Sequence, residues 1–334
     1  MIAGAIDRRK RGTSVQPALL RSPAMPESGA SIEVETDKLC RSFGGQVVLR
    51  DIDLKVSSGE IVCVVGGSGS GKTVLLHHLI GLLAPSSGRV LAADHNAGPG
   101  ADGGPTLVDL ADLSDEELDM IRLHWAVVFQ SNALFSGSVR ENIALWLREH
   151  TTLSPEEIEK RVVDSLRSVA LKPEEVIDKD RDELSGGMAK RVAIARAIAC
   201  DPLVMFYDEP TTGLDPVIAG TIHELVWKTH NMPAGEGLPL RDVDAETDRI
   251  QRESRAKLKR TTIIVTHDRE LLRRLAPRVV MLAGTRKVFD GPYAAFGASS
   301  CPEAEAYLRE MPVLNSMAYR GQAPTARPPH DGRT

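Results

Sequence analysis

The 334-residue sequence lacks several features that mark specialised classes of protein. It has only four cysteines, and no two of them have the close spacing of a metal-ligand pair: Cys40, Cys63, Cys200 and Cys301. Cys63 and Cys200 lie in or beside apolar runs, so we expect them to be reduced core residues. The formal net charge is −5, which gives no general case for binding nucleic acid.

Long apolar segments are also missing. No apolar run approaches the roughly 18–20 residues that a membrane-spanning helix needs. The basic residues 8–11 are not followed by the apolar region of a signal peptide. We therefore expect a soluble, cytoplasmic protein. Residues 1–30 are rich in Ala, Ser, Pro and Arg without periodicity, and we predict that they form a disordered tail.

A glycine-rich stretch is the most informative part of the chain. It follows the apolar run Ile61–Val65, precedes a helical run from Val74, and consists of Gly66, Gly67, Ser68, Gly69, Ser70, Gly71, Lys72 and Thr73. The spacing G-x-x-x-x-G-K-T is that of the phosphate-binding P-loop, although a Gly/Ser loop can also merely turn the chain. Glycines let successive N–H groups surround an anion at the positive end of the helix. Lys72 is expected to contact the β- and γ-phosphates, and the Thr73 hydroxyl to bind Mg²⁺.

Two further predicted strands are followed by residues that can take part in catalysis or metal binding. The apolar run Leu203–Tyr207 ends in Asp208 and Glu209. Asp208 can hold Mg²⁺ and its water shell, and Glu209 can polarise an attacking water. A later strand, Thr262–Thr266, brings His267 to the same edge of the sheet. A single acid or histidine could be an ordinary cap or a solvated residue, but signals in this order predict a nucleotide hydrolase.

A second anion-binding feature lies far from the first. Ser185, Gly186 and Gly187 come just before residues 189–199, whose composition strongly favours a helix. At the N-terminus of that helix they could bind phosphate or only cap the helix. One nucleotide needs only one phosphate loop, so the second feature suggests that two copies complete each other's sites. Phe43, just before the Gly44-Gly45 turn, could be a core aromatic, but an exposed turn favours stacking on adenine.

Together these motifs resemble the nucleotide-binding subunit of ABC transporters over roughly residues 32–296. The resemblance implies ATP and Mg²⁺ as cofactors, with Glu209 as the catalytic glutamate. It assigns the Q-loop glutamine, the D-loop aspartate and the switch histidine to Gln130, Asp215 and His267. Catalysis is then expected from Glu209, His267, Gln130 and Lys72, and metal binding from Thr73, Gln130 and Asp208. The family forms a head-to-tail dimer that holds ATP between residues 66–73 of one copy and Ser185–Gly187 of the other.

The resemblance also implies a fold and a division of the chain. The fold is an α/β P-loop core with an antiparallel β edge and an α-helical subdomain near residues 131–185. We assign residues 31–298 to this ATPase domain and 299–334 to a C-terminal extension that is disordered at its end. Residues 228–260 form an insertion, with a solvated helix from Asp242 to Arg260 that leans on the domain. Residues 94–106 are predicted to be a surface loop.

Shorter matches point to a class of cargo. Met188 after the Ser-Gly-Gly motif, Leu147–Thr151 and Phe129–Phe135 look like ATPases paired with Mce-type lipid-transport systems, the Mla class. This implies movement of lipid or other hydrophobic cargo by a separate permease, with an Mce-domain protein, at the cytoplasmic face of the inner membrane. The alternatives are the ATPase of a small-solute importer and a soluble ABC ATPase outside transport. A single P-loop, with no long coiled coil or zinc site, disfavours the latter.

Two regions are expected to contact partners. Phe135, near Gln130, is predicted to anchor a short helix of the permease, the alternative being that it packs internally. A short helix is predicted over Pro302–Met311. The apolar residues that follow could dock on their own domain, and we hypothesise that they dock on the second copy: Val313, Leu314, Met317 and Tyr319.

Overall fold

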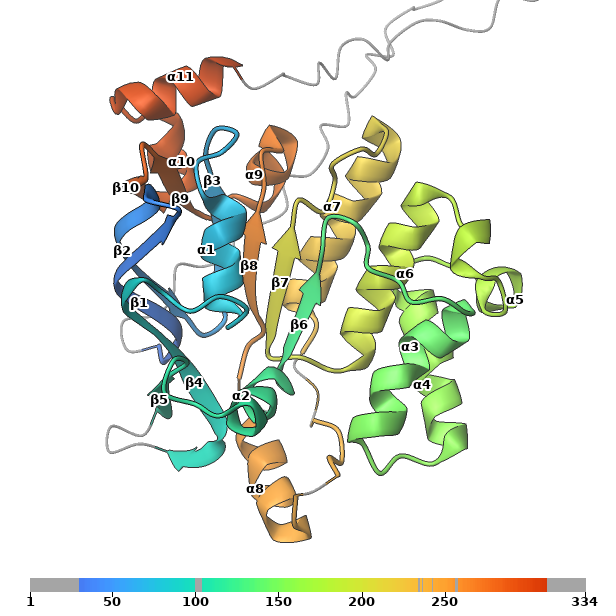
Figure 1. Cartoon of the computed structure of the whole chain (residues 1–334). Helices are drawn as coiled ribbons and strands as arrows, with labels where there is room; N and C mark the ends of the chain where they lie inside the picture. The colour runs from blue at the N-terminus through green and yellow to red at the C-terminus, as the bar shows by residue number, and fades with distance from the viewer. Residues whose placement is uncertain are drawn as a thin grey trace, which may run out of the picture.

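The computed structural model describes residues 30–99, 104–233, 235, 237–241, 243–255 and 258–310. Within these ranges the strands form two sheets, ordered β2-β1-β4-β5 and β10-β9-β3-β8-β7-β6. Helices cover both faces of the second sheet and form a separate helical group beside it (Figure 1). The predicted α/β fold, with an antiparallel edge and a helical subdomain, is confirmed.

The six-stranded sheet forms the centre of the molecule. Its parallel strands are β6 (Trp125–Val128), β7 (Val204–Asp208), β8 (Thr261–Val265), β3 (Ile61–Val65) and β9 (Arg278–Ala283), and β10 (Arg286–Pro292) is antiparallel to β9. Every residue of β3, β7 and β8 is buried, which explains why their sequences are mostly apolar. Because these strands are parallel, the residues that follow them meet at one edge, where open α/β sheets bind ligands.

The four-stranded antiparallel sheet contains β1 (Ile32–Phe43), β2 (Gln46–Ser57), β4 (Ser87–Pro99) and β5 (Pro105–Asp109). The prediction of a surface loop over 94–106 was wrong for residues 94–99, which continue β4, and for residues 105–106, which begin β5. Polar side chains can lie in this part of β4 because they form hydrogen bonds with other side chains. His95 Nε2 lies 2.8 Å from Glu33 Oε2, and Asn96 Oδ1 lies 2.8 Å from His124 Nε2.

Helix α1 (Lys72–Leu79) packs between the two sheets (Figure 1). Its residues Leu75, Leu76 and Leu79 are fully buried with apolar residues of both sheets. Helix α2 (Asp115–Arg122) begins with the predicted capping box, in which Ser114 and Glu117 bond reciprocally. The far face of the central sheet packs against α6 (Gly186–Ala199), α7 (Pro216–Asn231) and α9 (Arg269–Leu275).

The helical subdomain contains α3 (Val139–His150), α4 (Pro155–Ser168), α5 (Pro173–Val176) and the short 3₁₀ helix η1 (Arg181–Glu183), packed with α6. Helices α3 and α4 both start with capping boxes, from Ser138 and Ser154. Buried residues such as Leu147, Val162 and Val192 belong to the same apolar cluster as the central sheet. The position of α6 is therefore fixed against both the sheet and the helical subdomain.

The predicted insertion begins within α7, which includes residues 228–231, and its own helix is α8 (Ala245–Arg255). Helix α8 is shorter than the predicted 242–260, because residues 258–260 extend away from it into β8. The predicted pair of Asp248 and Arg252 is present. The helix leans on the domain, since the buried Arg255 donates to the carbonyl of Asp201 at 2.6 Å. The predicted pair of Glu253 and Lys257 lies outside the described residues.

The last described helices are α10 (Tyr293–Gly297) and α11 (Pro302–Glu310). Tyr307 of α11 packs on Phe296, and Arg269 donates to the carbonyl of Leu308 at 3.1 Å. Helix α11 thus docks on its own chain, whereas the apolar residues beyond it and the tail 1–29 lie outside the described ranges. Cys63 is buried, and the four thiols are free. Within the described part of the chain, no helix is long and apolar enough to cross a membrane.

Candidate functional site

The glycine-rich loop joins β3 to α1 at the carboxyl edge of the central sheet. Gly71 is the N-cap of α1, with a left-handed φ of 94°. A Cβ on Gly71 would lie 2.8 Å from the Leu49 side chain, and one on Gly66 would lie 2.3 Å from the carbonyl oxygen of Leu282. Glycine is therefore required at both positions, because other segments of the same chain come too close to allow a side chain. Because the loop is rich in glycine and leads into a helix N-terminus, a polyphosphate can approach its backbone N–H groups closely.

Lys72 lies across the loop. Its ammonium donates to the carbonyls of Gly66 at 2.9 Å and Gly67 at 3.0 Å. Burial lowers the pKa of Lys72, while the carboxylates of Glu209 and Asp208 act in the opposite direction. A cation is thus placed beside the glycine loop and near the two acids at the end of β7.

Thr73 and Asp208, two of the predicted Mg²⁺ ligands, come together from α1 and β7. The Thr73 hydroxyl donates to Asp208 Oδ1 at 3.5 Å. Burial, and then the neighbouring charge of Glu209, raise the pKa of Asp208. A hydroxyl and a carboxylate are the donor set that Mg²⁺ uses beside nucleotide phosphates, so these residues fit the ion.

Glu209 is held in a strained position directly after β7. Its φ is 47°, a left-handed conformation that is costly for a glutamate, and its N–H donates to the carbonyl of Val265 in β8 at 2.9 Å. Its carboxylate accepts from Thr212 Oγ1 at 3.2 Å. The same Oε2 lies 2.7 Å from Nδ1 of His267, the residue predicted to be the switch histidine. Glu209 and His267 therefore form a pair at the strand edge; the contact of Thr212 was not predicted.

The second predicted phosphate-binding feature begins α6. Ser185 is the N-cap, and its hydroxyl accepts from the N–H of Met188 at 3.3 Å. Gly187 packs closely on α7, because a Cβ there would lie 2.7 Å from the Ile218 side chain. In Figure 1 the starts of α1 and α6 are on opposite sides of β7. The structure thus does not bring Ser185–Gly187 to the glycine loop of the same chain.

A sequence model described as "ABC transporter" matches residues 49–212. The chain is 34% identical over 259 residues to the intermembrane phospholipid transport system ATP-binding protein MlaF of Haemophilus influenzae, covering 77% of this chain and 83% of that protein. It is 33% identical over 285 residues to protein TRIGALACTOSYLDIACYLGLYCEROL 3, chloroplastic, of Arabidopsis thaliana, covering 83% and 73%. The chain belongs to the ABC transporter family.

Solved ABC cassettes have the same fold. The structure of cbiO1 from Clostridium perfringens, part of the transporter complex cbiONQ, has a TM-score of 0.60 and 27% identity, covering 84% of this chain and 96% of that one. The dimeric cassette MJ0796, bound to ADP and Pi after hydrolysis, has a TM-score of 0.59 and 26% identity, covering 78% and 98%. This chain is therefore an ABC ATPase with a P-loop, a nucleotide-binding enzyme that hydrolyses ATP, as predicted.

The ABC ATPase has a hydrogen-bonded acid next to His267 that sequence reasoning missed. Asp268, next to His267, accepts from the Thr211 hydroxyl at 2.8 Å, and its Oδ2 lies 2.7 Å from Nε2 of the buried His223. It also caps α9 through the N–H groups of Glu270 and Leu271. Burial opposes ionisation of Asp268, but these hydrogen bonds and His223 outweigh it and lower its pKa to about 2. An acid directly before a helical run was the available signal for this cap.

The remaining predicted site residues are placed at the same edge or near it. Asp215 is the N-cap of α7 and accepts from the N–H groups of Val217 and Ile218. Gln130 follows β6, with its side chain exposed. Phe43 is 42% exposed, and the guanidinium of Arg41 lies 4.4 Å from its ring centroid. An exposed ring at the end of β1 fits the predicted stacking on adenine, which stays a prediction.

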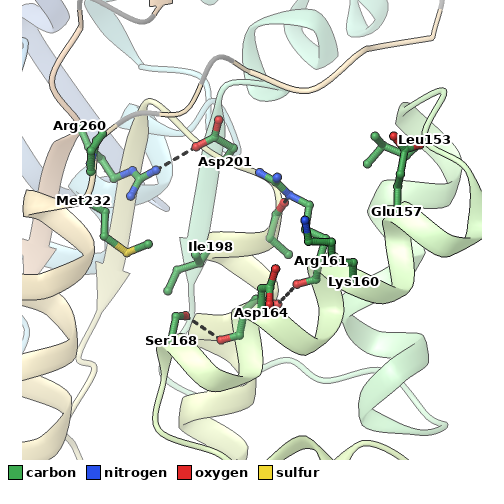
Figure 2. Close-up of a pocket in the computed structure, with 13 residues that line it drawn as sticks. Leu153, Glu157, Lys160, Arg161, Asp164, Ser168, Ile198, Asp201, Met232 and Arg260 are labelled. Atoms are coloured by element: carbon green, nitrogen blue, oxygen red, sulfur yellow. Dashed lines mark hydrogen bonds and ion pairs between the residues drawn. The ribbon is translucent and has the colours of Figure 1, made fainter.

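A crevice of about 390 Å³ lies away from these residues, between α4 and the segment that follows α7 (Figure 2). Its two arginines already have partners. Arg260 pairs with Asp201 at 3.1 Å, and Arg161 donates to the carbonyl of Ala199 at 2.6 Å. The crevice marks the junction of the helical subdomain with the central sheet, and it contains none of the predicted nucleotide-site residues.

Proposed function

We propose that this ABC ATPase binds ATP with Mg²⁺ and uses its hydrolysis to energise a separate permease that moves lipid or other hydrophobic cargo across a cell envelope. The observation that carries the proposal is the group of residues at the carboxyl edge of the sheet. There the glycine loop, the Thr73–Asp208 contact and the Glu209–His267 pair come from three neighbouring strands.

Nucleotide binding is assigned to residues 66–73. The loop amides and the Lys72 ammonium hold the phosphates, with the ammonium turning from the carbonyls of Gly66 and Gly67 to phosphate oxygens. Thr73 and Asp208 would hold Mg²⁺, with Gln130 completing the set as the resemblance implies. The bound ion would neutralise charge on the β- and γ-phosphate oxygens.

Hydrolysis is assigned to Glu209. Its carboxylate is anchored by Thr212 and fixed in direction by the left-handed backbone, so it can accept a hydrogen bond from the attacking water without reorganising. His267, whose side chain is 58% exposed, contacts the Glu209 carboxylate and would be accessible to the γ-phosphate of a bound nucleotide. Asp268 fixes the start of α9 and thereby the position of His267.

A second copy is part of the proposal. Ser185–Gly187 starts a helix that lies apart from the loop of its own chain, and such a helix N-terminus can close over the γ-phosphate bound by another copy. The dimeric form of the similar cassette MJ0796 supports this arrangement. Asp215, at the start of α7, would lie between the two sites.

The cargo is assigned from the relatives and from short sequence matches. The similarity to the phospholipid transport protein MlaF, together with Met188 and Leu147–Thr151, favours a lipid system with an Mce-domain partner at the cytoplasmic face of the inner membrane. A small-solute importer is the second candidate. It is favoured by 33% identity over 249 residues to the energy-coupling factor transporter protein EcfA2 of Clostridium tetani, covering 72% of this chain and 70% of that protein.

The test is to isolate the chain from membranes with its permease and to reconstitute the complex in liposomes. ATP-dependent movement of a fluorescent phospholipid to acceptor vesicles is expected, and the Glu209→Gln complex serves as the inactive control. Uptake of a small polar solute without phospholipid movement would replace the lipid assignment with the importer. ATP hydrolysis without any associated permease would favour a role outside transport.

A further inference from the structure

Residues 129–135, in the segment between β6 and α3, have backbone carbonyls that accept hydrogen bonds from cationic side chains. Arg181 of η1 donates to the carbonyl of Leu134 at 3.0 Å, and the other cations lie on α6. Lys190, in the middle of α6, donates to the carbonyls of Phe129 and Gln130, both at 3.0 Å. One turn and a half further along, Arg196 donates to the carbonyls of Ala133 at 2.9 Å and Asn132 at 3.4 Å. We name this arrangement the carbonyl clamp, formed by Lys190 and Arg196 on residues 129–133.

Lys190 is an unusual choice for its position. The residue is only 2% exposed, and burial lowers the pKa of its ammonium to about 8. An apolar side chain would be buried in a helix at lower cost, because a charged group loses its hydration there. Both recorded hydrogen bonds of the ammonium go to carbonyls of the segment. The ammonium therefore provides hydrogen bonds to two backbone carbonyls that lie just after the end of β6.

The clamped backbone is strained at its centre. Asn132 and Ala133 have φ values of 63° and 46°, in the left-handed region, and alanine has no side-chain hydrogen bond to compensate for this conformation. Such strain persists only where the surroundings over-determine the backbone, and strained residues cluster at functional sites. Here Arg196 holds the carbonyls of both residues, so the clamp helps to keep the strained conformation, together with the hydrogen bond from the N–H of Asn132 to the carbonyl of Phe129 at 3.2 Å.

The clamp joins three parts of the proposed machinery. Gln130 lies at one end of the segment, and Phe135, whose ring is 55% exposed, lies at the other, with the Arg196 guanidinium 5.3 Å from its ring centroid. Both cations belong to α6, which begins at Ser185–Gly187. A continuous helix moves as a rigid element, so a displacement of its start is carried to the carbonyls that its cations hold.

We propose that Lys190 and Arg196 are positioning residues. They fix residues 129–135 to α6, so that closure of Ser185–Gly187 over a nucleotide on the other copy sets the position of Gln130 and Phe135 in their own copy. The clamp acts through Gln130 and Phe135 and thus rests on the function proposed above. It adds the physical link between the two sites, which runs through main-chain carbonyls rather than through the side chain of Gln130.

The test compares Lys190→Met, which keeps the length of the side chain but removes the donors, with Lys190→Gln, which keeps an N–H donor. Lys172→Met, at an exposed lysine of the helical subdomain, is the matched control. Lys190→Met is expected to speed hydrogen exchange of amides 130–135 and to lower kcat about 10- to 100-fold, with KM for ATP nearly unchanged, because misplacing a catalytic group costs that much. Lys190→Gln should recover part of kcat, and Lys172→Met should behave as wild type.

Wild-type exchange at 130–135 together with wild-type kcat in Lys190→Met would overturn the proposal, as would a loss of kcat without a local change in exchange. If Lys190→Met does not fold, the comparison is made at the other end of the clamp with Arg196→Gln and Arg196→Lys. Hydrogen exchange is then measured at amides 132–135. Failure of the proposed function itself is distinguishable, since the wild-type chain would then hydrolyse ATP without moving phospholipid, whereas the clamp is read from differences in exchange and kcat between the variants and the wild type.

Discussion

Replacing Glu209 by glutamine removes one charge from the site and changes little else. In the folded chain the carboxylate accepts from Thr212 Oγ1 at 3.2 Å and from the N–H of His267 at 3.4 Å. The side chain of His267 also lies close, with Nδ1 2.7 Å from Oε2. The amide oxygen of glutamine can accept hydrogen bonds at the same positions, and the left-handed backbone at this position is unaffected. The substitution therefore isolates the ability of the carboxylate to polarise water from its structural contacts.

Two electrostatic consequences follow for the neighbours. Burial first, and then the charge of Glu209, raise the pKa of Asp208, so removing that charge lowers the pKa of Asp208 and favours its ionised form. The negative potential at the γ-phosphate position also decreases. ATP binding should thus be retained or strengthened in Glu209→Gln, while turnover falls about 10²- to 10³-fold, the usual cost of removing one such catalytic group.

The assay is phosphate release by the purified full-length chain, combined with equilibrium titration of a fluorescent ATP analogue. Glu224→Gln, at an exposed glutamate of α7, is the matched control and should match wild type in both measurements. Hydrolysis by Glu209→Gln at the wild-type rate would refute the assignment of Glu209 as the base. A loss of nucleotide binding in the same variant would refute the electrostatic reasoning.

The nucleotide loop could be predicted from the sequence because its determinants are local. Residues 66–73 follow a buried strand and start a helix, and both the glycine requirement and the helix N-terminus depend on neighbours in the chain. The acids after β7 and His267 after β8 were also predicted, since parallel strands deliver their carboxyl ends to one edge. Alternating apolar runs and loops thus contain most of the information about this edge.

The contacts that were not predicted join residues distant in sequence. His223 lies in the middle of α7, and nothing near it indicates that its partner is Asp268. Likewise, Lys190 gives no sequence signal that it will hold carbonyls 60 residues earlier. The polar composition of residues 94–99 predicted a loop, but the buried Glu33 and His124 supply partners that let His95 and Asn96 lie in a strand. Strand formation depends on such tertiary partners more than on local composition.

Three further perturbations test the nucleotide site, the permease contact and the support of the switch histidine. Lys72→Ala should weaken ATP binding about 10- to 100-fold, the equivalent of about 1.5–3 kcal/mol for hydrogen bonds to a charged group, and titration of labelled nucleotide would measure it. Phe135→Ala should abolish ATP-driven transport while leaving ATPase activity of the free subunit largely intact; a loss of folding, seen by circular dichroism, would instead mean that the ring packs internally. Asp268→Asn should lower the free energy of unfolding in a manner that depends on pH. The pKa of this carboxyl is about 2 in the folded chain against about 3.9 in an unfolded one, so the folded state favours the ionised form. Its contribution, about 2.5 kcal/mol, is complete above the unfolded pKa and disappears as pH falls through the folded pKa. Denaturant unfolding of the wild type and Asp268→Asn should therefore show a difference in the free energy of unfolding that is constant above pH 5 and shrinks between pH 4 and pH 2. The reason is that the protonated acid, like asparagine, carries no charge that could interact with His223. A difference that does not change over this range would place the stabilisation in the shape of the side chain and not in its charge.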